Sequence, residues 1–378
     1  MKILGIIAEY NPFHNGHKYH INKSKEIINP DYTIAVMSGN FVQRGEPAIF
    51  DKWTRAKFAA ENGIDAVIEL PVEFSLSTAE RFAFGGVSLL NDLCITHISF
   101  GTENSIDEIT DIFNKFSHNE KKITFLSKNS HNYLKSRDEI LGCDSVLKFS
   151  NNILGFEYLK ALKKLKSEII PIAIKRYGAD HDSMDTKNGI ASASFLRYNL
   201  TDVEVSKFSP CCFDNLTPVT KSLFSDLINY KIISSDIQKL AQIAEIREGL
   251  ENRIYKYGLL NLDVNTLIES VKSKRYTYTA ISRILFQILL DIKKNDLNCK
   301  PLYARVLAAN KKGTEFLNTV KHNTKIPLIT KPSSIYNFDR GIIKQAEKDF
   351  LATDIYKIVT RSKKTGKVDL TTSPVILK

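Results

Sequence analysis

Short apolar runs that alternate with amphipathic segments constrain the fold of the first half of the chain. The run from Ile3 to Ala8 is apolar on both faces, which is typical of a strand inside a parallel sheet. Similar runs occupy residues 32–37, 65–70, 96–101 and 168–174. Segments with helical periodicity lie between them, at residues 52–62, 79–93, 105–116 and 153–165. The alternation predicts an α/β fold with a doubly wound parallel sheet, whose ligands bind beyond the carboxyl ends of the strands.

The strand signals fade after about residue 200. Residues 217–297 have mostly helical periodicity, and from Pro301 onward short apolar runs mix with Lys and Pro. We therefore expect three parts: the sheet domain in residues 1–200, a helical domain in residues 201–300, and a small C-terminal α/β segment in residues 301–378.

Charge and cysteine usage narrow the classes of protein. The chain has a net charge of +11, which serves solubility or indicates a polyanionic partner such as nucleic acid or an anionic membrane. Its five cysteines show no CxxC or disulfide spacing. The apolar run at residues 3–8 is too short for a signal peptide, and no window approaches the roughly twenty apolar residues of a membrane span. We expect a reduced, cytoplasmic protein with no membrane partner.

Three of the eight histidines lie within residues 14–20, directly after the first predicted strand. A helix is expected to begin around Gly16 or His17 and to run to Ile28, so its free N–H groups would form an anion site at the cleft. His14 and His17, three positions apart, would add donors to the same anion. Two alternatives stay open: a zinc site, although no Cys or third His lies at a metal spacing, and ordinary surface histidines.

The segment His14-Asn15-Gly16-His17 resembles the HxGH signature of the nucleotidyltransferase superfamily. The resemblance implies that His14 and His17 stabilise charge near the α-phosphate of a nucleoside triphosphate, a role that suits positioned donors. "ASASFLR" at residues 191–197 is similar to the second superfamily signature, ISSTxxR, with alanine at two of its positions. Ser192 or Ser194 would cap a helix and Arg197 would reach a phosphate, while a simple serine N-cap is the alternative.

Several longer segments are similar to the tRNA(Met) cytidine acetate ligase family. They are "MSGNFVQRGEPAIFDKWTRAKFA" (37–59), "ISFGTE" (98–103), "SNNILGFEYLKAL" (150–162), "KRYGADHDS" (175–183) and "KRYTYTAISRIL" (274–285). The resemblance implies a nucleotidyltransferase-like fold and an ATP-dependent ligase. Such an enzyme forms acetyl-adenylate from acetate and ATP, and then acetylates the exocyclic amine of the wobble cytidine in elongator tRNA(Met). Mg²⁺ is expected to accompany ATP, with unknown ligands, and no tightly bound organic cofactor or obligatory protein partner is expected.

The resemblance also implies a set of nucleotide contacts, with His14 and His17 as the catalytic residues. The expected ATP-binding residues are Ile7, Ala8, Glu9, Tyr10, Asn11, Pro12, Phe13, His14, Asn15, Gly16, His17, His20, Gly101, Asn152, Arg176, Ser192, Ser194 and Arg197. Asn152 would otherwise be a helix N-cap. His181 and Asp182 could orient ATP or only form a turn.

The polar segment after the second predicted strand, residues 38–53, is expected to lie over the cleft as a lid loop. Arg44, Asp51 and Lys52 are its candidates for substrate or phosphate contact, and a plain surface loop is the alternative.

Basic residues and tyrosines interleave at residues 272–283. Basic side chains pair with phosphates and tyrosine rings stack on unpaired bases, so the expected tRNA contacts are Lys272, Lys274, Arg275, Tyr276 and Arg283. Alternatively, the charges are solvated at a helix start, and Tyr276 and Tyr278 pack into the core.

Two other functions remain as alternatives. One is an adenylyltransferase that acts on a small phosphate acceptor, and the other is a non-catalytic nucleotide-binding protein that binds RNA. The basic helical extension speaks against the first, and the intact His14, Gly16 and His17 speak against the second.

Overall fold

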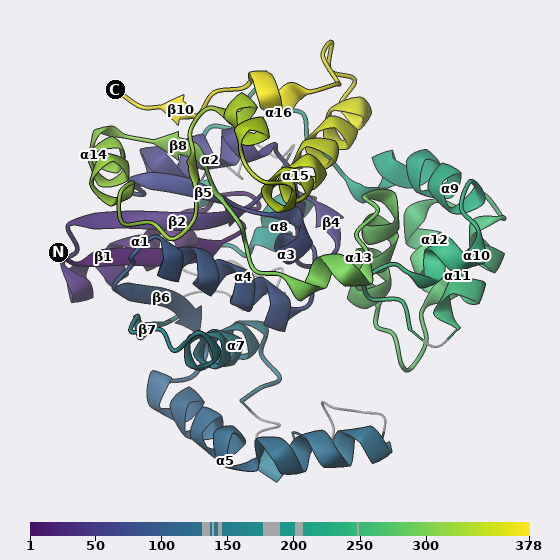
Figure 1. The fold of residues 1–378 in the computed structure, drawn as a ribbon, viewed down its shortest axis with the longest axis horizontal. Helices are drawn as coiled ribbons and strands as arrows, with labels where there is room; N and C mark the ends of the chain where they lie inside the picture. Colours follow the sequence, from purple (N-terminus) through teal and green to yellow (C-terminus); the bar gives the residue numbers. More distant parts are fainter. Residues whose placement is uncertain (131–136, 138–139, 143–145, 177–189, 201–206, 248) are drawn as a thin grey trace.

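A central mixed sheet organises the computed structural model, which describes residues 1–378 except 131–136, 138–139, 143–145, 177–189, 201–206 and 248 (Figure 1). Its parallel part has the order β5-β2-β1-β6-β7. These strands are β1 (Ile3–Ala8), β2 (Tyr32–Ser38), β5 (Ala66–Leu70), β6 (His97–Thr102) and β7 (Ile170–Lys175). All five lie where the apolar runs predicted them, which confirms the doubly wound α/β fold. The chain winds outward in both directions from β1, and the crevice at such a switch point is the usual ligand site.

Alternate residues of each central strand enter cores on opposite faces of the sheet. In β2, Ile34 and Val36 pack into one core, and Ala35 and Met37 pack into the other. This division explains why the strands are apolar at successive positions, because both faces are covered. Strands β1, β2, β5 and β6 are largely buried, so the polar residues that follow their carboxyl ends lie together at one edge of the sheet.

Two layers of helices cover the sheet. The core on one face includes residues of α1 (Asn15–Ile28) and α2 (Lys52–Glu61), and the core on the other includes residues of α4 (Ala79–Asp92) and α7 (Ser150–Leu165). The predicted helices at 52–62, 79–93, 105–116 and 153–165 are confirmed, although α5 (Ile106–Ser130) is longer than expected. The short helices α3 (Val72–Ser75) and α8 (Ala193–Tyr198) also belong to this part.

A separate lobe of helices follows the sheet domain, at the right of Figure 1. Its elements are η2 (Lys221–Phe224), α9 (Ser225–Ile233), α10 (Ile237–Ala241), α11 (Leu250–Gly258), α12 (Val264–Val271), α13 (Tyr278–Leu289) and η3 (Lys294–Asn298). The hairpin of β3 (Phe41–Val42) and β4 (Glu46–Pro47) joins this lobe to the sheet domain, because Phe41 packs against Phe224 and Phe286.

The C-terminal residues extend the same sheet. Strand β8 (Ala304–Ala309) pairs antiparallel with β5, and it also pairs with β9 (Leu328–Ile329) and β10 (Val375–Ile376). The remaining elements are α14 (Lys311–Val320), η4 (Pro332–Asn337), α15 (Arg340–Val359) and α16 (Val368–Thr371). Among the described residues, no helix combines the length and the hydropathy that a membrane span requires.

Candidate active site

A cavity of about 580 Å³ lies at the carboxyl ends of β1, β6 and β7. Its wall continues across the turn between β3 and β4 and onto α8 and α13, so both the sheet domain and the helical lobe contribute to it. Among the lining residues are Ile7, Ala8, Glu9, Tyr10, Asn11, His14, Gly16, His17, His20, Gln43, Arg44, Glu46, Gly101, Asn151, Tyr158, Arg176, Arg197, Thr279 and Arg283. This position agrees with the expected ligand site beyond the strand ends.

The N-terminus of α1 holds two stacked imidazole rings against the cavity. The Nδ1 atom of His14 accepts a hydrogen bond from the Gly16 N–H at 3.0 Å, and Nδ1 of His17 accepts one from the His14 N–H at 3.3 Å. An imidazole nitrogen that accepts a hydrogen bond carries no proton, so the neutral ring holds its proton on Nε2. The helix start therefore selects the tautomer in which both rings present an Nε2–H donor.

Glycine is required at position 16 by the close approach of His14. A Cβ atom on Gly16 would lie 2.8 Å from Cε1 and 3.0 Å from Nδ1 of His14, closer than side chains normally pack. The glycine thus lets the His14 ring fold over the first turn of the helix. The N–H groups of Gly16 and His17 are both taken up by His14, through its Nδ1 atom and its carbonyl oxygen, so the expected free backbone donors are engaged and the imidazole Nε2–H groups are the donors left for the cavity.

The loop between β1 and α1 is fixed by a buried arginine that sequence reasoning missed. Arg55 of α2 is fully buried, and its guanidinium donates to the carbonyl oxygens of Glu9, Ser38, Gly39 and Phe50. Burial lowers its pKa to about 10, so it stays charged at neutral pH. The basic residue pattern of α2 gave no signal for this role, because its partners are backbone atoms.

His20 lies one turn beyond His17 and is kept neutral. Burial, with a contribution from the positive charge of Arg176, lowers its pKa to about 4. Ser24 donates to the His20 carbonyl, Ser99 bonds to Ser24 at 2.7 Å, and Nε2 of His20 bonds to Ser99 at 3.0 Å. Because the Ser24 hydrogen is used on the carbonyl, Ser99 donates to Ser24 and His20 donates from Nε2.

The second signature closes the cavity from the side of α8. Ser192 caps this helix by accepting from the Phe195 N–H at 3.0 Å, as the N-cap alternative predicted. Arg197 donates to the Asn11 carbonyl at 2.8 Å and to Oγ of Ser194 at 3.1 Å, and it lines the cavity. The second signature is therefore joined to the loop that leads into the first, across 186 residues of sequence.

The three other expected nucleotide contacts lie on β6, α7 and the end of β7. Gly101 and Arg176 line the cavity, and a Cβ on Gly101 would meet only Cγ of Arg176, at 3.6 Å. Asn152 is fully buried behind the wall, where its oxygen accepts from the backbone N–H groups of Glu103 and Asn104. Its neighbour Asn151 faces the cavity instead. His181 and Asp182 lie outside the described residues.

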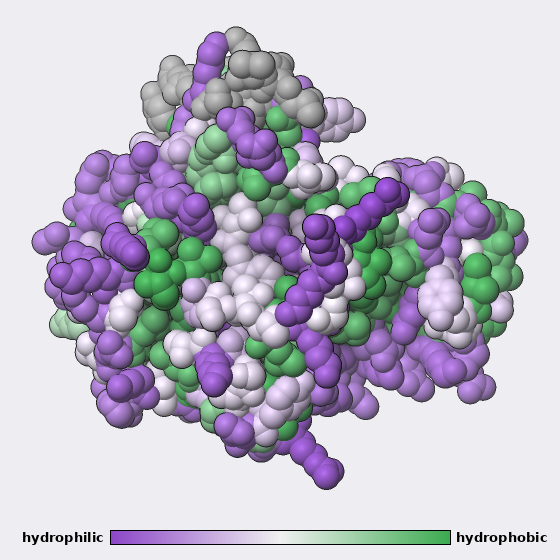
Figure 2. Space-filling model, turned by 90° about the horizontal axis from the view of Figure 1, so that it is seen from above, coloured by the Kyte–Doolittle hydropathy of each residue, from purple (hydrophilic) through white to green (hydrophobic). Residues whose placement is uncertain are grey.

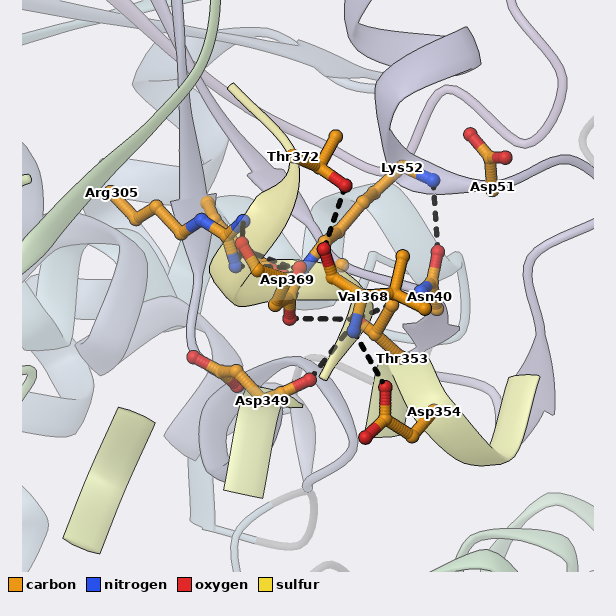
Figure 3. Close-up of polar contacts among 12 residues, drawn as sticks. Asn40, Asp51, Lys52, Arg305, Asp349, Thr353, Asp354, Val368, Asp369 and Thr372 are labelled. Atoms are coloured by element: carbon orange, nitrogen blue, oxygen red, sulfur yellow. Dashed lines mark hydrogen bonds and ion pairs between the residues drawn. The ribbon is translucent and has the colours of Figure 1, made fainter. Parts of the chain in front are cut away.

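The expectation that Asp51 and Lys52 contact substrate is wrong, while Arg44 does line the cavity. Asp51 caps α2 and pairs with Lys357 at 2.8 Å. Lys52 is completely buried and is not among the lining residues of the cavity. It pairs with Glu69 at 2.7 Å, and with Asp369 at 3.0 Å in the cluster shown in Figure 3. Arg305 pairs with the same two carboxylates. These partners come from β5, β8 and α16, so the cluster ties the C-terminal segment to the sheet.

The expected tRNA contacts divide into two groups. Lys272, Lys274 and Arg275 are exposed at the surface of the helical lobe. Tyr276 packs partly against the core of the lobe, as the alternative proposed, and donates from its hydroxyl to the Arg247 carbonyl. Arg283 is nearly buried, pairs with Glu245 at 2.7 Å and faces the cavity. Figure 2 shows hydrophilic residues over much of one face of the molecule, interrupted by apolar patches on both lobes.

The described residues contain no group of three or more His, Cys, Asp or Glu side chains that could hold a metal ion. Two carboxylates, Glu9 and Glu46, nevertheless line the cavity. The expected position of residues 38–53 at the cleft agrees with Gln43, Arg44 and Glu46 in the wall, although Gln43 and Glu46 were not singled out. Sequence reasoning also missed Tyr158 and Thr279, because they reach the site only through tertiary packing.

Comparison with known proteins gives consistent results for the whole chain. Residues 1–369 match the HIGH Nucleotidyl Transferase family. A tRNA(Met) cytidine acetate ligase of Thermoanaerobacter sp. (strain X514) is 42% identical, with 98% of each chain covered. One from Clostridium perfringens (strain SM101 / Type A) is 41% identical over 100% of both chains. The crystal structure of Thermotoga maritima TmcAL in its apo form superposes with a TM-score of 0.92 at 30% identity, covering 100% of both chains. TmcAL bound with alpha-thio ATP gives a TM-score of 0.90 with the same identity and coverage.

Proposed function

The chain belongs to the tRNA(Met) cytidine acetate ligase family of HIGH nucleotidyl transferases, and from this premise we propose how its cavity carries out the reaction. The protein is an ATP-dependent ligase that acts on a cytidine of tRNA(Met). In the reaction, acetate and ATP form acetyl-adenylate and pyrophosphate, and the acetyl group then passes to the exocyclic amine of the wobble cytidine in elongator tRNA(Met). The observation that carries the assignment of the site is the pair of stacked imidazoles at the start of α1, facing a cavity at the strand ends.

The triphosphate is placed over the first turn of α1. The Nε2–H groups of His14 and His17 are donors that need no reorganisation, and they lie at the positive end of the α1 dipole. Arg176 and Arg197 supply positive charge from the other walls. The adenosine lies toward Gly101, where the missing side chain leaves room.

In the first step, an acetate oxygen attacks the α-phosphorus and the bond to pyrophosphate breaks. His14 and His17 stabilise the negative charge that develops on the α-phosphate oxygens. Mg²⁺ would bind together with ATP, because this ion commonly binds through one or two carboxylates plus phosphate oxygens. The described residues contain no cluster of three or more ligating side chains that would hold it without the nucleotide. When bound, it neutralises charge on the triphosphate.

In the second step, the cytidine amine attacks the acetyl carbon and AMP leaves. The base must leave the anticodon stack to reach the cavity. We place its entry between the β3–β4 turn and α13, where Arg44, Thr279 and Arg283 form the wall. Lys272, Lys274 and Arg275 lie on the same lobe and are exposed for phosphate contact.

The test combines the protein with ATP, labelled acetate and tRNA. Label should enter elongator tRNA(Met) and should not enter the same tRNA in which the wobble cytidine is replaced by uridine. His17→Ala should abolish incorporation. ATP turnover that is independent of acetate and requires a phosphate acceptor would instead identify an adenylyltransferase. Absence of ATP turnover with every acceptor would indicate a non-catalytic nucleotide-binding protein that binds RNA.

A further inference from the structure

Glu9 stands at the junction of the two halves of the cavity. It directly follows the last residue of β1, and its Oε1 accepts a hydrogen bond from the Gln43 N–H at 2.8 Å. Gln43 begins the turn that crosses to the helical lobe, where Ser282 donates to the Gly45 carbonyl. A Cβ on Gly45 would lie 2.2 Å from the backbone nitrogen of Arg283, so the turn touches α13. The carboxylate is thus held between the α1 side and the α13 side.

Glu9 was expected among the ATP contacts, but its negative side chain is poorly suited to touch the triphosphate directly. ATP brings several negative charges, and a second carboxylate, Glu46, lies close enough to raise the pKa of Glu9. Glu46 is partly neutralised by Arg197, whose Nη2 lies 3.7 Å from it. A carboxylate in such a place is better matched to a group that carries hydrogens to donate, and the amine of cytosine is such a group.

We propose that Glu9 is the base that accepts a proton from the cytidine amine during acetyl transfer, an inference that rests on the proposed function. The amine nitrogen forms a bond to the acetyl carbon, and the bond from that carbon to the AMP oxygen breaks. AMP leaves with the electron pair, and the proton of the amine passes to the Glu9 carboxylate. The hydrogen bond from Gln43 fixes one carboxylate oxygen, so the acceptor is oriented before the base arrives.

The surroundings of Glu9 tune it for this task. Burial raises its pKa, the Gln43 N–H lowers it, Glu46 raises it, and Arg197 and Arg44 lower it, with a raised value as the net result. A raised pKa makes the carboxylate a stronger base near neutrality. Five charged or titratable groups of neighbouring elements face Glu9. They are Glu46 of β4, Arg44 of the β3–β4 turn, Arg197 of α8, Arg55 of α2 and Tyr158 of α7.

The experiment separates the two half-reactions in the full-length protein. Acetate-dependent exchange of pyrophosphate into ATP reports the first step, and single-turnover transfer of labelled acetyl to tRNA(Met) reports the second. Glu9→Gln should keep the exchange rate within about twofold and slow the transfer by about 10²- to 10⁴-fold. In the unaltered protein, transfer should rise with pH through the Glu9 ionisation, and this rise should vanish in Glu9→Gln and return, shifted, in Glu9→Asp.

The matched control is Glu157→Gln. Glu157 is also a buried carboxylate whose pKa is raised by burial, but it pairs with Lys160 on α7 outside the cavity wall. This variant should keep both half-reactions and the pH profile.

Two results would overturn the proposal. Equal losses of exchange and transfer in Glu9→Gln would assign Glu9 to ATP or Mg²⁺ binding, and an unchanged transfer rate would remove it from the reaction. Failure of the proposed function itself would be distinct, because the unaltered protein would then show neither exchange nor transfer.

Discussion

The imidazole rings of His14 and His17 stack with their centroids 3.7 Å apart and their planes at 28°. Each ring uses Nδ1 to accept a hydrogen bond from the backbone of the same helical turn. His14 therefore has two duties, because it caps α1 and also presents a donor to the cavity. The two duties can be separated by substitution.

His14→Ser should keep the cap and remove the donor. Serine is among the preferred N-cap residues, so the free energy of unfolding should change by less than about 1 kcal/mol. Its short side chain cannot replace the imidazole Nε2–H, and acetate-dependent pyrophosphate exchange should fall by about 10²- to 10³-fold, as for the loss of one preorganised donor. Urea unfolding and exchange kinetics measure the two effects. A variant that unfolds easily but retains exchange would show that His14 only caps the helix.

Gly16→Ala should displace the His14 ring, and with it the N-cap of α1. The new Cβ would lie 2.8 Å from Cε1 of His14, so the imidazole has to rotate away. Alanine is preferred over glycine inside helices by about 1 kcal/mol, which roughly offsets the loss of the cap at about 1 kcal/mol, so the melting temperature should change little. Exchange activity should drop while the fold persists. Gly366→Ala is the control, since a Cβ there meets nothing within 4 Å; equal activity in both variants would contradict the expected clash.

Protonation of His20 should destabilise the fold in acid. Its pKa is lowered from 6.5 to about 4 in the folded protein, so the unfolded state binds more protons between these values. The free energy of unfolding should therefore fall as the pH drops from about 6.5 toward 4, by at most about 1.4 kcal/mol per pH unit from this group. His20→Gln can still donate to Ser99 and cannot titrate. The difference between the two stability curves over pH isolates His20, and parallel curves would exclude its contribution.

Lys52→Met should destabilise the protein without impairing the site. The positive charges of Lys52 and Arg305 balance the negative charges of Glu69 and Asp369. Nearby, burial raises the pKa of Asp349, which accepts a hydrogen bond from Tyr303, well above its ordinary value. Removal of one buried partner should cost about 3 to 5 kcal/mol. Lys57→Met breaks an exposed pair with Glu61 and should cost less than about 1 kcal/mol. A raised KM for ATP in Lys52→Met with an unchanged free energy of unfolding would instead show that Lys52 contacts the nucleotide.

The contrast between Lys52 and Arg55 shows what the sequence could reveal. The strands and the histidine helix were predictable because both faces of the sheet are covered and because the HxGH pattern is local. Lys52 and Arg55 sit on one short helix, and nothing local distinguishes a buried ion pair from a loop anchor. Asp369, which holds Lys52, follows more than 300 residues later in the chain. The position of Arg283 in the cavity wall was not predictable for the same reason, since Glu245 and the β3–β4 turn hold it there, and its contact with tRNA stays a prediction.

The exposed basic residues before α13 should contribute to tRNA binding through phosphates alone. Lys274→Ala with Arg275→Ala should weaken tRNA(Met) binding at low salt and should reduce the slope of log affinity against log salt by about 1 to 2. Acetate-dependent exchange, which needs no tRNA, should stay unchanged. The control is Lys321→Ala, which removes one exposed lysine at the end of α14, away from the helical lobe. Filter binding across a salt series measures the slopes. The same slope in all three proteins would move the tRNA surface away from this segment, because a protein that neutralises fewer phosphates must release fewer counterions when it binds.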